Sequence, residues 1–286
     1  MKRKVIIFGL LVLMSIGLEY EMENLYFGEV TLLELGEYLS GLGLVVIYCI
    51  PLGLLMRRLW RQVGLSFEAG IITIMVGCFV SGWLAGEANT YIESLWYLAL
   101  PNAEWLIDWN DALAAPFVEE ILKCACALLV MYLIGERRLS AAFVIGMVIG
   151  FGFQLIEDLN YVLQAETITF EMAAYRAAGA LSSHWMMTGV TTAGVWGLWL
   201  WYREKVESLS LGWLWVSALM PMGLHFIWNS PLGYLWVTSL VSAAIIYLWG
   251  RLYLTWFGRT GLCVGEDGAV FDGIKRKGED GCQPYN

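Results

Sequence analysis

Residues 115–123 read Ala-Pro-Phe-Val-Glu-Glu-Ile-Leu-Lys, and they place two adjacent carboxylates and a lysine inside an apolar run that continues to residue 134. Because apolar residues flank Glu119, Glu120 and Lys123 on both sides, these groups do not belong to a solvated helix face. Ionisable groups at membrane depth are costly, and they usually face the interior of a helix bundle or a wet cavity. The stretch therefore predicts a polar site buried within a membrane helix.

The composition of the whole chain is that of a membrane protein. Of its 286 residues, 59% are hydrophobic and 15% are charged, and the mean hydropathy is +0.63. A soluble domain is nearer half apolar and about a quarter charged. The net charge of −9 argues against nucleic acid as a partner. We therefore expect an all-α, polytopic integral membrane protein that lies in the lipid bilayer and binds no nucleic acid.

The apolar runs predict about eight transmembrane helices, of which the longer ones match the roughly 20 residues that a bilayer requires. Small residues at 82/86 and 146/150 predict close packing between helices. We expect residues 1–257 to form the transmembrane domain, with its motif-bearing core at about 112–230, and residues 258–286 to form a flexible cytoplasmic tail. The expected spans are residues 5–18, 42–56, 69–86, 112–134, 141–163, 173–201, 211–229 and 232–257.

The distribution of charge predicts the orientation of these spans. Clusters of Arg and Lys precede the first span and follow the second, fourth, sixth and eighth, whereas acidic segments follow the first, third and fifth. Basic residues favour the cytoplasmic side of a membrane. We therefore expect a protein of the cell membrane with both termini in the cytoplasm.

Polar residues interrupt four consecutive spans at a similar depth. Counted from the outer end of each span, Glu120 lies about eight residues in, Glu157 about six, His184 about ten and His225 about five, which differ by no more than about two helical turns. The chain has only these two histidines. The shared depth predicts one polar site toward the extracytoplasmic side of the membrane.

Within the first of these spans, Glu119 and Lys123 are four residues apart and are expected to form an ion pair on one helix face. Glu120 is rotated by about 100° from Glu119, so it can point elsewhere.

Two further pairs of residues share a helix face. Phe153 and Glu157 are four residues apart, as are His225 and Asn229. Asp158 lies one step off the face of Glu157, where an interfacial or capping group is more usual than a catalytic one.

These groups together suit hydrolysis. A carboxylate desolvated in a bundle can act as a base, a second carboxylate drives the two pKa values apart, and imidazole and amide groups can stabilise an oxyanion. Attack by activated water on a carbonyl is therefore the first hypothesis. The same groups also suit a metal site with an open position for water, with Glu120 as the base, or a proton relay in a transporter. No internal repeat of the kind common in transporters is present in the sequence.

Four motifs in order resemble the PrsW intramembrane proteases, which are related to CAAX prenyl endopeptidases and bacteriocin-processing proteins. They are Glu119-Glu120-x-x-Lys123, Phe153-x-x-x-Glu157, His184 and His225-x-x-x-Asn229, and the resemblance spans about residues 114–230. One departure is Asp158, where relatives commonly have Asn.

The resemblance implies a protease that cuts a single-span membrane protein, such as an anti-sigma factor, near the extracytoplasmic face. We take Glu120 as the residue that activates water, assisted by Glu157 and His184, while His225 and Asn229 polarise the scissile carbonyl. Lys123 would neutralise Glu119, and Phe153 and Asp158 would support the site.

This mechanism uses a glutamate base and requires no metal or other cofactor. Two alternatives to it stay open. One is a Zn²⁺-dependent protease whose ligands are His184, His225 and Glu157. The other is a sensor or immunity protein that binds a peptide without cutting it.

Overall fold

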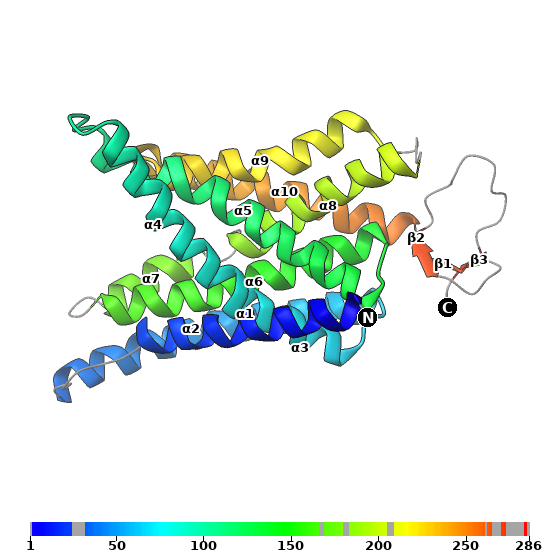
Figure 1. Cartoon of the computed structure of the whole chain (residues 1–286), viewed down its shortest axis with the longest axis horizontal. Helices are drawn as coiled ribbons and strands as arrows, with labels where there is room; N and C mark the ends of the chain where they lie inside the picture. The colour runs from blue at the N-terminus through cyan, green and yellow to red at the C-terminus, as the bar shows by residue number, and fades with distance from the viewer. Residues whose placement is uncertain are drawn as a thin grey trace.

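The computed structural model describes residues 2–24, 32–165, 169–179, 183–204, 209–260, 262–264, 270–272 and 283–284. Within these residues the chain is almost entirely helical, which confirms the all-α prediction. The helices lie side by side along one long axis and form a single bundle (Figure 1).

The helices mostly extend beyond the apolar runs that predicted them. α3, the π-helical turn η1 and α4 follow one another without a break, so that the third span runs from residue 67 to residue 99. The elements are α1 (Lys2–Asn24), α2 (Leu32–Gln62), α3 (Phe67–Val76), η1 (Gly77–Ser81), α4 (Gly82–Ala99), α5 (Leu106–Ile134), α6 (Leu139–Gln164), α7 (Thr169–Gly179), α8 (His184–Arg203), α9 (Leu211–Asn229), the 3₁₀ turn η4 (Pro231–Tyr234) and α10 (Trp236–Thr260).

Six helical segments of the described residues are long and apolar enough to cross a membrane. They are α1, α2, the α3–α4 segment, α6, α9 and α10. α5 and α8 do not qualify by composition, because α5 carries Glu119, Glu120 and Lys123 in its middle and α8 is rich in tryptophan. The two helices that depart from membrane composition are thus ones that carry residues of the predicted site.

α6 is the central helix of the bundle, and 94% of its most apolar window is buried inside the protein. Its glycines let α8 approach closely, as the sequence predicts. A Cβ atom at Gly150 would lie 2.4 Å from the carbonyl oxygen of His184, and one at Gly146 would lie 2.7 Å from that of Thr188. The absence of side chains at these two positions therefore sets the position of the start of α8.

Residues 173–201 do not form the single span that the sequence predicts. α7 ends at Gly179 and α8 begins at His184. Ser183 has a non-helical backbone (φ −100°, ψ −146°), and its carbonyl oxygen accepts the first hydrogen bonds of α8, from the amides of Met186 and Met187. Glycine and serine favour helix ends over helix interiors. The break puts His184 at the N-terminus of a helix instead of in its middle.

The helices begin and end at two opposite ends of the bundle, and the orientation of the bundle in the membrane stays a prediction. α1 begins, and α5, α8 and α10 end, at the right of Figure 1, whereas α4, α6 and α9 end at the left. The predicted site lies toward the left end, since Glu157 and His225 are in the last two turns of α6 and α9.

The segment that follows α10 contains a small antiparallel sheet. Its strands are β1 (Leu262–Val264), β2 (Val270–Asp272) and β3 (Gln283–Pro284), in the order β2-β1-β3, with Cys263 opposite both Phe271 and Pro284. The other residues of the predicted tail (258–286) beyond α10 lie outside the described residues. The boundary at residue 257 stays a prediction, and α10 continues to Thr260.

Candidate active site

α5 brings Glu119, Glu120 and Lys123 into the interior of the bundle. Nζ of Lys123 lies 3.4 Å from Oε2 of Glu119, which confirms the expected ion pair. It lies closer, 2.6 Å, to Oε1 of Glu120. Although its rotation on the helix allows Glu120 to point elsewhere, it joins this pair. Two carboxylates share one ammonium group, because residues three and four positions apart both reach the same side of a helix.

His184, the first residue of α8, lies between this cluster and α6. Its Nδ1 atom is 2.9 Å from Nζ of Lys123, and its Nε2 atom is 3.0 Å from Oε2 of Glu157. The ring of Phe153 packs edge-on against it, with ring centroids 5.1 Å apart, and also lies 4.3 Å from Nζ of Lys123. Phe153 and Glu157 thus face the same site, as their spacing predicts.

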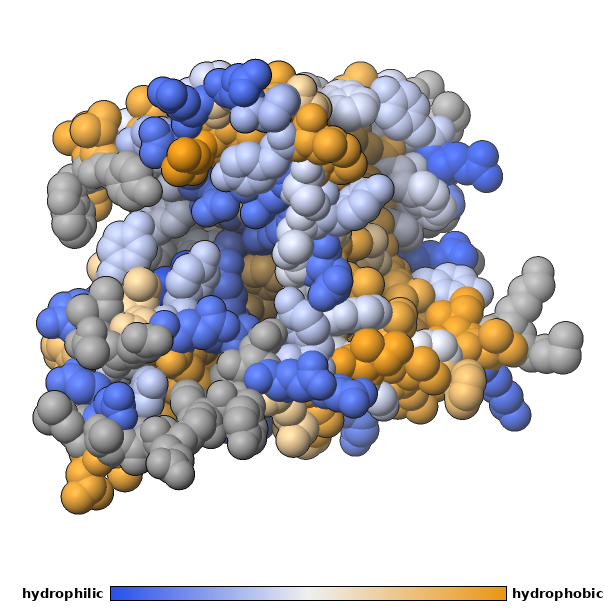
Figure 2. All heavy atoms as spheres, turned by 60° about the vertical axis from the view of Figure 1, so that its left-hand side comes forward, coloured by the Kyte–Doolittle hydropathy of each residue, from blue (hydrophilic) through white to orange (hydrophobic). Residues whose placement is uncertain are grey.

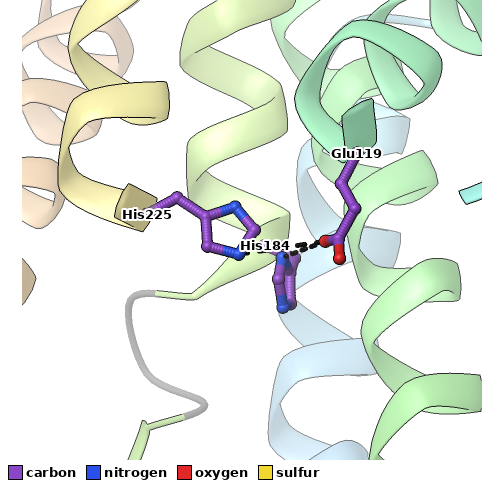
Figure 3. Close-up of side chains that lie close together, drawn as sticks. All are labelled: Glu119, His184 and His225. Atoms are coloured by element: carbon purple, nitrogen blue, oxygen red, sulfur yellow. Dashed lines mark ion pairs between the residues drawn. The ribbon is translucent and has the colours of Figure 1, made fainter. Parts of the chain in front are cut away.

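His225 approaches the same carboxylates from α9. Its Nε2 atom lies 3.8 Å from Oε2 of Glu119, and its Nδ1 atom lies 3.4 Å from Oε1 of Glu120. Its ring centroid is 5.0 Å from that of His184. Figure 3 shows Glu119, His184 and His225 pointing toward one another from three different helices. The structure therefore joins residues that are up to about a hundred positions apart in the chain.

Several residues that the sequence analysis did not select hold these groups. Asn89 of α4 donates a hydrogen bond of 3.1 Å to Oε1 of Glu119. Thr188, one turn after His184, donates one of 3.2 Å to Oε2 of Glu120. Both carboxylates of α5 are therefore fixed by a second polar partner. For Thr188 the signal was its position four residues after His184, whereas no pattern singles out Asn89.

Arg176 of α7 is the largest omission of the sequence analysis. Its guanidinium donates to Glu157 through Nη2 and to Asp158 through Nε. Asp158 is fully buried and also accepts a hydrogen bond from Tyr48 of α2. In the sequence Arg176 lies within an apolar span, and a lone arginine there, beside two acids of the preceding span, is a usable signal. Arg176 thus joins α7 to α6 at Glu157 and Asp158, and Asp158 in turn joins them to Tyr48 of α2.

A cavity of about 320 Å³ opens beside this cluster. Figure 2 shows the end of the bundle that lies at the left of Figure 1, hollowed at its centre and surrounded by hydrophilic side chains. Glu120 has no exposed surface and does not line the cavity. The predicted site residues that do line it are Phe153, Glu119, Glu157, His184, His225 and Asn229.

Asn229 is placed less closely than the others. It is the last residue of α9, is half-buried and lines the cavity. His225 lies one turn before it, as the spacing predicts. The side-chain amide of Asn229 is therefore available to a molecule in the cavity.

The comparison with known families agrees with this geometry. A model of the PrsW family, described as intramembrane metalloproteases, matches residues 66–254. The chain belongs to the PrsW family. The match covers about two thirds of the chain and extends beyond residues 114–230, and α1 and α2 lie outside it. It identifies this PrsW protein as a membrane-embedded peptidase. No curated protein and no solved structure matches the chain.

The family description raises the question of whether these residues suit a metal ion. Glu119, His184 and His225 each offer one ligand atom, and these atoms all lie within 4.8 Å of one another. Two imidazoles and one carboxylate are the ligand set of several catalytic zinc sites. Each imidazole also has its other nitrogen against a carboxylate, Glu157 for His184 and Glu120 for His225. Such outer carboxylates orient histidines that bind metals. The residues therefore fit a divalent metal, with Glu119 grouped with the histidines where the sequence analysis had Glu157.

Proposed function

We propose that this PrsW protein hydrolyses a peptide bond of a single-span membrane protein within the cavity beside Glu119. The convergence of Glu119, His184 and His225 on one wall of a polar cavity carries this proposal. Such a cavity gives water and an extended peptide access to groups that are otherwise enclosed by apolar helices.

In the form that the geometry favours, Glu119, His184 and His225 hold a divalent metal ion such as Zn²⁺. A bound zinc ion would polarise the scissile carbonyl and lower the pKa of a water molecule. Glu157 would accept a hydrogen bond from the outer nitrogen of His184, and Glu120 lies 3.4 Å from the outer nitrogen of His225, so a carboxylate stands beside each ring to orient it.

Glu157 is the second carboxylate that lines the cavity, and its side chain is 21% exposed. This exposure places it to exchange a proton with water or with the leaving amine. Arg176 compensates its charge and holds its position. Asn229 also lines the cavity and can donate to the substrate carbonyl.

Burial favours Glu119 over Glu120 as the central carboxylate. Glu120 is fully buried and lies behind Glu119, held by Lys123 and Thr188. We therefore place Glu119, and not Glu120, at the reacting centre, as a metal ligand or, in a metal-free enzyme, as the base that activates water. Glu120 supports His225 and keeps Lys123 in place.

A metal-free glutamate peptidase is the second candidate, and one observation favours it. Nζ of Lys123 lies 2.9 Å from Nδ1 of His184 and 3.4 Å from Oε2 of Glu119. An ammonium group therefore already occupies the position from which a metal ion would contact two of the three candidate ligands. In this form Glu119 accepts the proton of the attacking water. His225 and Asn229 donate to the developing oxyanion.

The orientation is part of the proposal. The start of α1 and the ends of α5 and α8 carry clustered Arg and Lys residues. These helix ends lie at the end of the bundle opposite the cavity (Figure 1). If that end faces the cytoplasm, cleavage occurs toward the extracytoplasmic side.

Metal analysis of the purified protein, run beside a cleavage assay with and without chelator, tests the proposal. The substrate is a candidate single-span protein reconstituted with the enzyme. Stoichiometric zinc with cleavage that is lost on chelation and restored by zinc supports the metal-dependent form. Cleavage by protein free of metal supports the second candidate. No cleavage of any single-span substrate, with or without zinc, would contradict the proposed function.

A further inference from the structure

α1 forms part of the cavity wall, although it lies outside the matched part of the family. Gly17 of α1 packs directly on η1, since a Cβ atom there would lie 1.5 Å from the carbonyl oxygen of Phe79. One turn later, Tyr20 packs on α4, where a Cβ atom at Gly86 would lie 2.8 Å from its hydroxyl oxygen. This close packing directs Tyr20 and Glu21 toward the cavity, which both residues line.

Glu21 is a buried carboxylate that the proposed reaction does not use. It is 2% exposed, and its Oε2 atom accepts a hydrogen bond of 2.8 Å from Nδ2 of Asn160. In the part of the chain that the structure describes, no other residue bonds to Glu21 and no basic group pairs with it. A carboxylate can accept about four hydrogen bonds, and burying its charge without a cation is costly. Glu21 therefore has spare acceptor capacity.

The side-chain carbonyl oxygens of two neighbouring asparagines also lack a hydrogen-bond donor. Asn160 uses its nitrogen on Glu21, and Asn89 uses its nitrogen on Glu119. Their carbonyl oxygens are buried without a hydrogen-bond donor. Both residues line the cavity beside Glu21. This wall therefore presents acceptor atoms from α1, α4 and α6 to any molecule in the cavity, and a group rich in donors would satisfy them.

We propose that Glu21, Asn160 and Asn89 form a subsite that binds a lysine or arginine side chain of the substrate. The inference rests on the proposed function, because it gives the substrate a cationic residue close to the scissile bond. Arg176, the basic residue that lines the same cavity, is held by Glu157 and Asp158 and does not serve as this cation. Asn160 lies one turn after Glu157 on α6, so the subsite adjoins the reacting groups.

The test uses synthetic single-span peptides that differ at one position. Lys, Gln or Glu is placed in turn at each of about five positions on either side of the cleavage site, which covers about 17 Å of extended chain on each side. For each peptide kcat/KM is measured with the wild type, Glu21→Gln and Glu21→Lys. Glu23→Gln is the matched control, because it removes the same charge from an exposed position of the same helix.

We expect the wild type to prefer Lys over Gln at one position by about tenfold or more, since a buried charge loses much of its stabilisation when its partner is removed. Glu21→Gln abolishes this preference, Glu21→Lys shifts it toward the Glu peptide, and Glu23→Gln retains it. Equal kcat/KM for the three peptides at every position, or a preference that survives in Glu21→Gln, would overturn the inference. If Glu21→Lys does not fold, the comparison of Glu21→Gln with Glu23→Gln decides.

A binding measurement separates this inference from the proposed function. The same peptides, each carrying a photoreactive group, are cross-linked to the wild type and to Glu21→Gln. The amount of peptide captured measures binding and does not depend on cleavage. Preferential capture of the Lys peptide that Glu21→Gln loses supports the subsite even if no peptide is cleaved, in which case only the peptidase proposal fails. Equal capture of the Lys, Gln and Glu peptides by the wild type contradicts the subsite.

Discussion

Nζ of Lys123 lies 2.9 Å from Nδ1 of His184. An ammonium group only donates hydrogen bonds, so Nδ1 accepts and Nε2 of the neutral ring carries the proton toward Glu157. The tautomer of His184 thus follows from its two neighbours. The same Nδ1 lone pair is the one that faces Glu119 and would bind a metal ion. Lys123 and a metal ion therefore compete for one position.

Replacing Lys123 tests this competition. Lys123→Met leaves Glu119 and Glu120 without their shared cation, and removing one partner of a buried charge pair costs about 3–5 kcal/mol. We expect a lower melting temperature in detergent for metal-free Lys123→Met, and a larger rise in melting temperature on addition of zinc than in the wild type. The double variant Lys123→Met/Glu120→Gln should recover part of the loss. An unchanged melting temperature in Lys123→Met would show that the ammonium does not stabilise the cluster.

The ligand set distinguishes Glu119 from Glu157. We expect Glu119→Gln to lose stoichiometric zinc, because a carboxylate oxygen within 4.8 Å of both imidazole ligands is removed. Glu157→Gln should keep zinc with an affinity about 10–100-fold lower, as for other residues that orient a histidine ligand. Zinc content and competition with a fluorescent chelator measure both. The opposite ranking of the two variants would restore the set His184, His225 and Glu157.

Arg176 is expected to act through Glu157. Arg176→Gln removes the guanidinium that holds this carboxylate, and we expect kcat to fall by about 10–100-fold. Arg176→Lys should recover part of the activity, because it retains the charge but loses the two-pronged geometry. Arg58→Gln, at an exposed position of α2, is the control. If Arg176→Gln cleaves at the wild-type rate, Glu157 does not need this support.

A further test concerns Gly150, whose lack of a side chain lets the backbone of His184 pack closely against α6. A Cβ atom at Gly150 would lie 2.4 Å from the carbonyl oxygen of His184. Gly150→Ala must displace the start of α8, and overpacking of this kind costs about 1–3 kcal/mol. We expect lower thermal stability and a loss of cleavage. Gly43→Ala in α2 meets nothing within 4 Å and should leave both unchanged or raise stability slightly. Similar behaviour of the two variants would contradict the packing argument.

The orientation in the membrane is testable by labelling. A cysteine at Glu104, exposed before α5, should react with an impermeant thiol reagent added from outside. A cysteine at Arg137, exposed after α5, should react only after permeabilisation. Both are placed in a Cys263→Ser/Cys282→Ser background. The reverse pattern would place the cavity toward the cytoplasm.

Much of the site was predictable because charged and polar residues are conspicuous in apolar spans. Glu119, Glu157, His184 and His225 stand out for this reason, and their shared depth follows from counting residues along helices. Distances between helices were not predictable, because they depend on which faces pack, as Gly150 does for His184. Glu21 was missed for the same reason, because it is unremarkable along its own helix and meets the site only in three dimensions. The partners of Arg176 likewise become visible only in the structure, although a lone arginine in an apolar span marks the residue itself.

The break between α7 and α8 shows a second limit of the sequence. Because apolar composition continues through residues 173–201, hydropathy along the sequence predicts one helix where the structure has two. Gly179 and Ser183 permit the break, but such residues also occur within membrane helices. The consequence for function is large, since the break lets α7 bring Arg176 beside Glu157 while α8 begins at His184.

The decisive measurement for the part that Glu119 plays in the reaction is cleavage of a single-span substrate by Glu119→Gln. In the proposed reaction Glu119 is a metal ligand or, in the metal-free form, the base. We therefore expect cleavage to fall by at least about 10²–10⁴-fold, the range for loss of a catalytic acid or base. The protein should remain folded, since Lys123 keeps its closer partner, Glu120. Cleavage by folded Glu119→Gln at the wild-type rate would contradict the account.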